Sequence, residues 1–227
     1  MSSTHKLSSV IFDLDGTLVD SAPGILSSFN AVLHQAGISP AVTLDYSIIG
    51  PPLRKTLASL TGSSDSALLD SLSAEFKDHY DNFGILETRI YEGIPFLLEA
   101  LLDADISLHI CTNKRLSPSS SILNSMGWRK NFVSLYALDM EQNRFSDKAS
   151  LLSAQIKELS LNPASTIFVG DTQADGIASK ENEIPFNYAA WGYGGASLKD
   201  IPIDWTWADS PESLLTALSS RLRVPAS

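Results

Sequence analysis

The chain has 227 residues, a formal charge of −10 at pH 7 and an apolar fraction of 44 %, which is typical of a globular protein with room for one large domain or two modest ones. The acidic balance argues against nucleic acid and anionic membrane as partners, because both bind basic surfaces. Cys111 is the only cysteine, so an internal disulfide is excluded. A reducing, cytoplasmic location is expected, since the sequence shows neither a secretory nor a membrane-spanning segment.

An apolar run of three residues, Val10, Ile11 and Phe12, predicts a buried strand near the start of the chain. Asp13 and Asp15 follow it within three residues, and these residues disfavour strands, so the strand should end there. Ligands of an open α/β sheet bind beyond the carboxyl ends of its strands. Two carboxylates there would repel each other unless a cation lies between them or one holds a proton. The end of this strand is therefore a candidate chemical site.

The next 65 or so residues read as helices only, with apolar positions at helical spacing over residues 22–36, 51–60 and 64–80. Ser21 is a candidate cap for the first helix, and Gly37 is a candidate stop. An all-helical stretch inserted after the first strand of an α/β chain predicts a separate helical subdomain.

From residue 91 onwards predicted helices and strands alternate, which implies a parallel sheet with right-handed crossovers. The predicted helices cover residues 94–102, 118–126, 147–159 and 211–222. The predicted strands cover residues 106–111, 132–137, 166–169 and 186–190, with 203–208 as an edge strand. The glycine-rich segment 191–195 predicts a flexible loop.

Polar side chains follow three of the predicted strands. They are Asp13, Asp15, Thr112, Asn113 and Asp171. Parallel strands end at the same edge of a sheet, so these groups can converge, and Lys148 begins a helix between the last two strands. A carboxylate nucleophile, oxygen ligands for a hard cation and donors for phosphate oxygens are what phosphoryl transfer requires.

The segment Phe-Asp-Leu-Asp-Gly-Thr-Leu-Val-Asp-Ser at residues 12–21 resembles the first motif of the haloacid dehalogenase superfamily, in particular the small phosphatases typified by phosphoglycolate phosphatase. Gly-Asp-Thr-Gln-Ala-Asp at residues 170–175 resembles its fourth motif. The resemblance implies a Rossmann-like doubly wound parallel sheet, formed by residues 1–17 and 90–227. It also implies a small helical cap, residues 18–89, that closes over the site and helps to select the substrate.

Asp13 is the predicted nucleophile, because a carboxylate of ordinary pKa is ionised at neutral pH and needs no activating base. Asp15 is the predicted general acid and base. The resemblance implies the same two roles. It further implies that Mg²⁺ is bound by the Asp13 carboxylate, the Asp15 backbone carbonyl and Asp171, with Asp175 as a second ligand or as a partner that orients Asp171. An all-oxygen set suits Mg²⁺.

Thr112 is expected to donate its hydroxyl to the phosphate, together with the backbone N–H of Asn113, although a Thr in this position could also cap a helix. Lys148 matches the lysine that neutralises phosphate and nucleophile in the resembled family, except that Ala149 follows it where many relatives have proline. Lys114 and Lys157 are weaker candidates for that role.

The sequence thus predicts a Mg²⁺-dependent phosphatase that hydrolyses a small phosphorylated metabolite, similar to phosphoglycolate, through an aspartyl phosphate. Arg54, in a segment that resembles a cap loop of the phosphoglycolate branch, is a candidate partner for a substrate carboxylate. The alternatives are a sugar-phosphate mutase similar to β-phosphoglucomutase and a non-catalytic phospho-acceptor module. A monomer or weak homodimer is expected.

Overall fold

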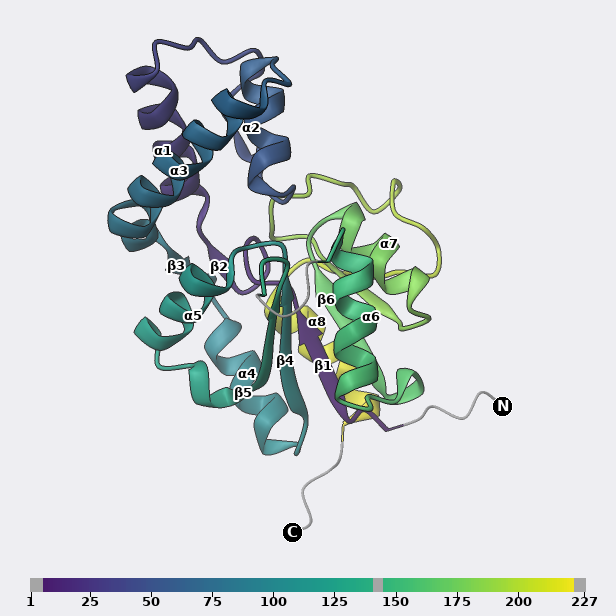
Figure 1. Cartoon of the computed structure of the whole chain (residues 1–227). Coiled ribbons are helices and arrows are strands. Elements are labelled where there is room, and N and C mark those ends of the chain that lie inside the picture. Colours follow the sequence, from purple (N-terminus) through teal and green to yellow (C-terminus); the bar gives the residue numbers. More distant parts are fainter. Residues whose placement is uncertain (1–5, 141–144, 223–227) are drawn as a thin grey trace. The chain divides into compact units, whose positions relative to one another are not determined.

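The computed structural model describes residues 6–140 and 145–222 (Figure 1). The chain divides into two compact units, one formed by residues Met1–Leu18 and Ile90–Ser227 and the other by Val19–Arg89. None of the helices in the described part of the chain combines the length and the apolar composition that a membrane crossing needs.

The first unit is built on a six-stranded sheet with the order β5-β4-β1-β6-β7-β8. Its strands are β1 (Ser9–Phe12), β4 (Ser107–Thr112), β5 (Phe132–Ala137), β6 (Thr166–Gly170), β7 (Phe186–Ala189) and β8 (Thr206–Ala208). Every neighbouring pair is parallel. All four residues of β1 are buried, as expected for a parallel sheet that is covered on both faces.

The helices of this unit cover the two faces of the sheet (Figure 1). α6 (Lys148–Glu158) and α7 (Gln173–Glu181) pack together on one face. α4 (Ile94–Asp103), α5 (Leu116–Ser125) and α8 (Pro211–Leu218) lie on the other. The chain leaves β1 toward β4 and β5 and then crosses to β6, so the direction of winding changes beside β1. That reversal is where ligands bind in open α/β sheets.

The second unit contains α1 (Ala22–Gln35), α2 (Leu53–Thr61) and α3 (Ser66–Asn82). α1 and α3 pack through aromatic rings, with the centroids of Phe29 and Phe76 4.3 Å apart. Gly24 and Gly84 allow close backbone approach, since a Cβ at Gly24 would lie 1.8 Å from the Gly84 carbonyl oxygen. The short strands β2 (Val19–Asp20) and β3 (Arg89–Ile90) pair with each other where the chain enters and leaves this unit.

Five short 3-10 helices complete the described elements. They are Tyr46–Ile48, Gly84–Glu87, Arg129–Asn131, Pro163–Ser165 and Ser219–Arg221.

The predicted α/β class with a helical insertion after the first strand is confirmed, and most predicted elements agree within two residues. The edge strand is shorter than predicted and begins at Thr206, because a turn closed by the Trp205 N–H and the Pro202 carbonyl occupies residues 202–205. Ser21 lies at the start of α1, but its side chain makes no capping hydrogen bond; instead Asp20 accepts from the Ala22 N–H at 3.1 Å.

Candidate active site

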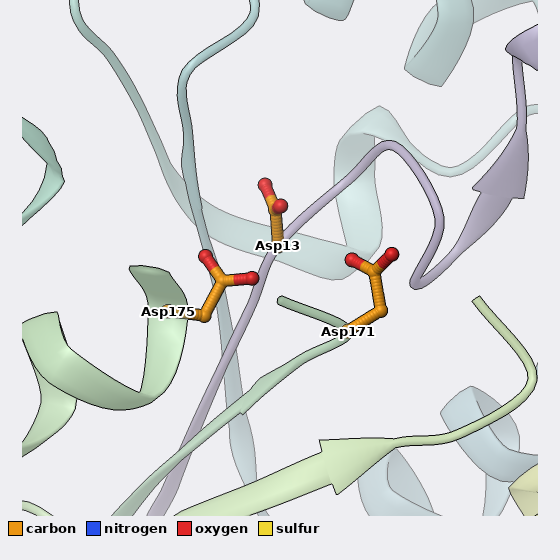
Figure 2. Close-up of side chains that lie close together, drawn as sticks. All are labelled: Asp13, Asp171 and Asp175. Carbon is orange, nitrogen blue, oxygen red and sulfur yellow. The ribbon is translucent and has the colours of Figure 1, made fainter. Parts of the chain in front are cut away.

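Three carboxylates meet at the carboxyl ends of two adjacent strands (Figure 2). Asp13 follows β1, Asp171 follows β6, and Asp175 lies in the first turn of α7. One oxygen from each lies within 4.8 Å of the others, and all three residues are buried. The register explains the meeting, because Phe12 pairs with Val169 and the Asp13 N–H donates to the Val169 carbonyl at 2.9 Å.

Lys148 lies among these carboxylates at the start of α6 and is itself buried. Its ammonium group is 2.8 Å from Asp13 Oδ2 and also pairs with Asp175 Oδ1. Burial by itself lowers the pKa of Lys148, but the charges of Asp13 and Asp175 outweigh it and raise the pKa, so the side chain is a fixed cation. Lys157, the weaker alternative on the same helix, is exposed.

The three carboxylates are crowded beyond what one ammonium group compensates. Burial raises the pKa of Asp13 from 3.8 to about 6, against the opposing charge of Lys148. Burial, followed by the charges of Asp175 and Asp13, raises the pKa of Asp171 well above 3.8. Removing carboxylates from water without compensation is costly, so this site favours a bound cation or a bound proton.

Two groups that the sequence analysis did not assign to the site hold Asp171 in place. Its Oδ1 accepts from the Thr17 hydroxyl at 3.2 Å, and its Oδ2 accepts from the Tyr193 backbone N–H at 2.7 Å. Gly16 has a φ of +79°, and a Cβ there would lie 2.2 Å from Asp171 Oδ2. Only glycine therefore permits both the turn and the approach of the carboxylate.

The segment that carries Tyr193 was predicted to be a flexible loop, and the structure instead packs it against the site. The Trp191 indole N–H donates to the Thr17 carbonyl at 2.9 Å. A Cβ at Gly192 would lie 2.2 Å from the Gly16 carbonyl oxygen, and one at Gly194 would lie 1.9 Å from the Asp171 carbonyl oxygen. Gly192 and Gly194 thus allow close backbone contact, which composition alone does not distinguish from flexibility.

Asp175 differs from Asp13 because both of its carboxylate oxygens have protein partners. Oδ1 accepts from Lys148, and Oδ2 accepts from the Thr172 N–H at 3.0 Å and the Thr172 hydroxyl at 2.6 Å. The Thr172 side chain also caps the start of α7. These contacts favour Asp175 as the residue that fixes Lys148 and the start of α7.

Asp15 lies beside the cluster and pairs with a lysine that the sequence analysis ranked low. Lys114 Nζ is 3.0 Å from Asp15 Oδ1 and 3.2 Å from Asp15 Oδ2. The sequence could not predict this ion pair, since it joins residues 99 positions apart.

Thr112 is the last residue of β4, is buried, and is followed by Asn113. The register pairs Phe12 of β1 with Ile110 of β4, which brings Thr112 to the same edge of the sheet as Asp13. Its hydroxyl oxygen accepts from the Lys114 N–H at 3.2 Å. Thr112 does not cap α5, whose first N–H at Leu116 is accepted by Asp139 at 2.7 Å.

Arg54 lies on α2 of the second unit. Its guanidinium pairs with Asp70 and donates to the Ser66 hydroxyl at 2.9 Å, both within that unit. The ion pair is largely exposed to solvent, with side-chain exposures of 48 % and 66 %.

The residues present fit a divalent cation. Among the residues that the structure describes, Asp13 Oδ1 has no hydrogen-bond partner; it is buried and belongs to an all-carboxylate cluster, the donor type that Mg²⁺ prefers. Four carboxylates, of Asp13, Asp15, Asp171 and Asp175, face two ammonium groups, of Lys114 and Lys148. Acidic groups therefore outnumber basic ones at this site, which favours a bound cation.

Comparison with known proteins places this site in a family. The family model described as haloacid dehalogenase-like hydrolase matches residues 10–189. A phosphoglycolate phosphatase of Xanthomonas campestris is 30 % identical over 198 residues, covering 86 % of this chain and 88 % of the relative. A relative from Mycobacterium bovis named tyrosine-protein kinase PtkA is 32 % identical over 192 residues, covering 84 % of this chain and 65 % of the relative.

Among solved structures, a predicted phosphatase from Clostridium acetobutylicum superposes with a TM-score of 0.84 at 26 % identity, covering 95 % of this chain and 99 % of that one. The matched segment begins in β1 and ends in β7, so it includes both strand ends that carry the carboxylate cluster. The chain belongs to the haloacid dehalogenase-like hydrolase family and is an enzyme of its phosphoric monoester hydrolase group.

Proposed function

We propose that the enzyme is a Mg²⁺-dependent phosphatase that hydrolyses a small phosphate monoester through an aspartyl phosphate on Asp13. The observation that carries the proposal is the state of the Asp13 carboxylate. One oxygen is bound by Lys148, and the other is buried and has no hydrogen-bond partner in the described part of the chain. A buried acceptor without a partner is costly in a folded protein unless a ligand satisfies it.

In the first step, an Asp13 oxygen attacks phosphorus and the bond from phosphorus to the ester oxygen breaks, while Asp15 gives its proton to the leaving oxygen. In the second step, Asp15 takes a proton from water as the water oxygen attacks phosphorus. The bond between Asp13 and phosphorus then breaks and frees inorganic phosphate. Asp15 thus ends each cycle protonated, as it began.

The remaining residues act on the charge of the phosphate. Lys148, the Thr112 hydroxyl and the Asn113 N–H are proposed donors to its oxygens. Asp13, the Asp15 backbone carbonyl and Asp171 would hold Mg²⁺, and Asp175 would orient Lys148 rather than bind the ion directly. When bound, Mg²⁺ neutralises the carboxylates and the phosphate and polarises the phosphorus centre.

The Val19–Arg89 unit is the proposed cap and the other unit the proposed catalytic core. Phosphoglycolate is the first substrate to test, because a phosphatase of that name is 30 % identical to this chain. Another relative of similar identity is named as a kinase. Sequence identity alone therefore does not show whether water or another molecule accepts the phosphate. The acceptor has to be identified from the products.

Asp13→Asn tests the proposal, with 4-nitrophenyl phosphate as a general substrate. Hydrolysis should be lost in the variant and should be reversibly abolished in the wild type by EDTA, with recovery on adding Mg²⁺. Asp103→Asn, which changes an exposed carboxylate at the end of α4, is the matched control and should retain full activity. Full activity in Asp13→Asn would disprove the nucleophile assignment.

Product analysis separates the alternatives. A mutase would convert one sugar phosphate into its isomer without releasing phosphate. A phospho-acceptor module would remain phosphorylated on Asp13 without turnover. Free phosphate in amounts far above the enzyme concentration supports a phosphatase.

A further inference from the structure

The ion pair between Lys114 and Asp15 has no role in the scheme above. The ammonium of Lys114 lies 3.0 and 3.2 Å from the two oxygens of the Asp15 carboxylate. The pair is shielded, with side-chain exposures of 7 % for Lys114 and 14 % for Asp15. Lys148 cannot replace it, because its own ammonium is engaged by Asp13 and Asp175.

The fold fixes both ends of this pair. Phe12 of β1 pairs with Ile110 of β4, so Asp15 follows the register position by three residues and Lys114 by four. The Lys114 backbone N–H donates to the Thr112 hydroxyl oxygen at 3.2 Å, which fixes the turn after β4. A shielded ammonium that contacts both oxygens restricts the carboxylate more than a single exposed contact would.

We propose that Lys114 is a positioning residue that sets the place of the Asp15 carboxylate and acts on turnover only through it. The inference rests on the proposed function, since it gives Asp15 the proton transfer to the leaving oxygen. Proton transfer depends on placement within hydrogen-bond reach of the reacting oxygen, and a displacement of about 1 Å can cost on the order of 100-fold in rate. Lys148 contacts the proposed nucleophile, Asp13, and Lys114 positions the proposed general acid and base, Asp15.

The test compares two leaving groups in Lys114→Met, whose side chain is of similar length but uncharged. An alkyl phosphate such as phosphoglycolate or glycerol phosphate needs a proton on its leaving oxygen, whereas nitrophenolate departs without one. The first turnover of the alkyl ester should slow about 100-fold. The first-turnover burst of nitrophenolate from 4-nitrophenyl phosphate should stay within about twofold of wild type. Because both rates come from one sample, a partly unfolded preparation does not alter their ratio.

A double-mutant cycle with Asp15→Asn gives the second readout. If Lys114 acts through Asp15, Asp15→Asn with Lys114→Met should be no slower on the alkyl ester than Asp15→Asn alone. Lys114→Arg, which keeps the charge, should recover most of the rate. Lys157→Met is the matched control, because Lys157 is an exposed lysine of α6. This variant should change the rate with neither substrate.

The outcomes separate the two levels of the account. If Lys114→Met slows hydrolysis of both esters equally, the positioning role is wrong while the phosphatase assignment stands. The same holds if the double variant is slower on the alkyl ester than Asp15→Asn alone. A wild type that hydrolyses neither ester would overturn the proposed function, and the role of Lys114 would fall with it.

Discussion

Replacing the proposed nucleophile should make the metal-free protein more stable, not less. Burial raises the pKa of Asp13 from 3.8 to about 6. The folded protein therefore holds this proton up to about pH 6, while the unfolded chain releases it near pH 4. The free energy of unfolding falls as the pH rises between those two values, and the full penalty is present above them. Each pKa unit corresponds to about 1.4 kcal/mol, so ionised Asp13 costs about 3 kcal/mol at pH 8.

Asp13→Asn keeps the shape and removes the charge, so it should recover that free energy. In a chain of this length, about 1 kcal/mol shifts Tm by about 2–4 °C, so we expect an increase of about 6–12 °C at pH 8 in EDTA. The difference should shrink as the pH falls toward 4. All four tryptophans, Trp128, Trp191, Trp205 and Trp207, lie in the sheet-containing unit, so their fluorescence reports the unfolding of that unit.

Mg²⁺ should remove most of the difference in stability between the two proteins. An ion at about 100 times its Kd stabilises the wild type by about 2.7 kcal/mol, and Asp13→Asn should gain much less because it lacks a ligand. Asp103→Asn should follow the wild type throughout. An Asp13→Asn protein that is no more stable than wild type at pH 8 in EDTA would refute the reasoning about the crowded carboxylates.

Three further predictions test other parts of the structure. Burial lowers the pKa of His109 from 6.5 to about 4, so this residue should destabilise the folded state by about 3 kcal/mol as the pH falls from 6.5 to 4. In urea unfolding, the difference in free energy of unfolding between wild type and His109→Gln should change by that amount over this pH range. A difference that stays constant with pH would contradict the prediction. Gly192→Ala would place a Cβ 2.2 Å from the Gly16 carbonyl oxygen and 2.3 Å from Asp171 Cβ. The affinity for Mn²⁺, measured by titration, should therefore fall about tenfold or more. An unchanged affinity would show that this contact does not contribute to metal binding. Arg54→Ala should lower stability by less than about 1 kcal/mol, because its ion pair is exposed, yet raise KM for phosphoglycolate more than KM for glycerol phosphate; equal KM changes would remove Arg54 from carboxylate recognition.

The central strands and their polar ends could be predicted because they depend on short-range patterns. Val10, Ile11 and Phe12 are apolar and fully buried, and the chain turns at Gly16, where the φ of +79° favours glycine. The order of strands and helices then brings Asp13 and Asp171 together without any further information.

The start of α5 shows where local patterns fail. The sequence predicts that this helix begins at Pro118. It begins at Leu116 instead, because the Leu116 N–H donates to the distant Asp139 at 2.7 Å. Proline is tolerated at the third position, since the N–H groups of the first turn have no partner within the helix. A cap supplied from 23 positions away leaves no mark in the helix's own sequence.

The two features of the site that the sequence analysis missed have the same origin. The hydrogen bond from Tyr193 to Asp171 joins residues 22 positions apart. The ion pair between Lys114 and Asp15 joins residues 99 positions apart. Glycines that allow tight packing and glycines that allow motion look alike in a sequence. Only the contacts of residues 191–195 distinguish them.

The most direct test of the account is to find where phosphate becomes attached during turnover. Wild-type enzyme mixed with 4-nitrophenyl phosphate and Mg²⁺ and quenched in acid within the first turnover should carry one hydroxylamine-sensitive phosphate, and peptide mass spectrometry should place it on Asp13. Asp13→Asn and EDTA-treated enzyme should carry none. Phosphate on any other residue, or hydrolysis at the wild-type rate with no phosphorylated Asp13 at any time, would contradict the central claim.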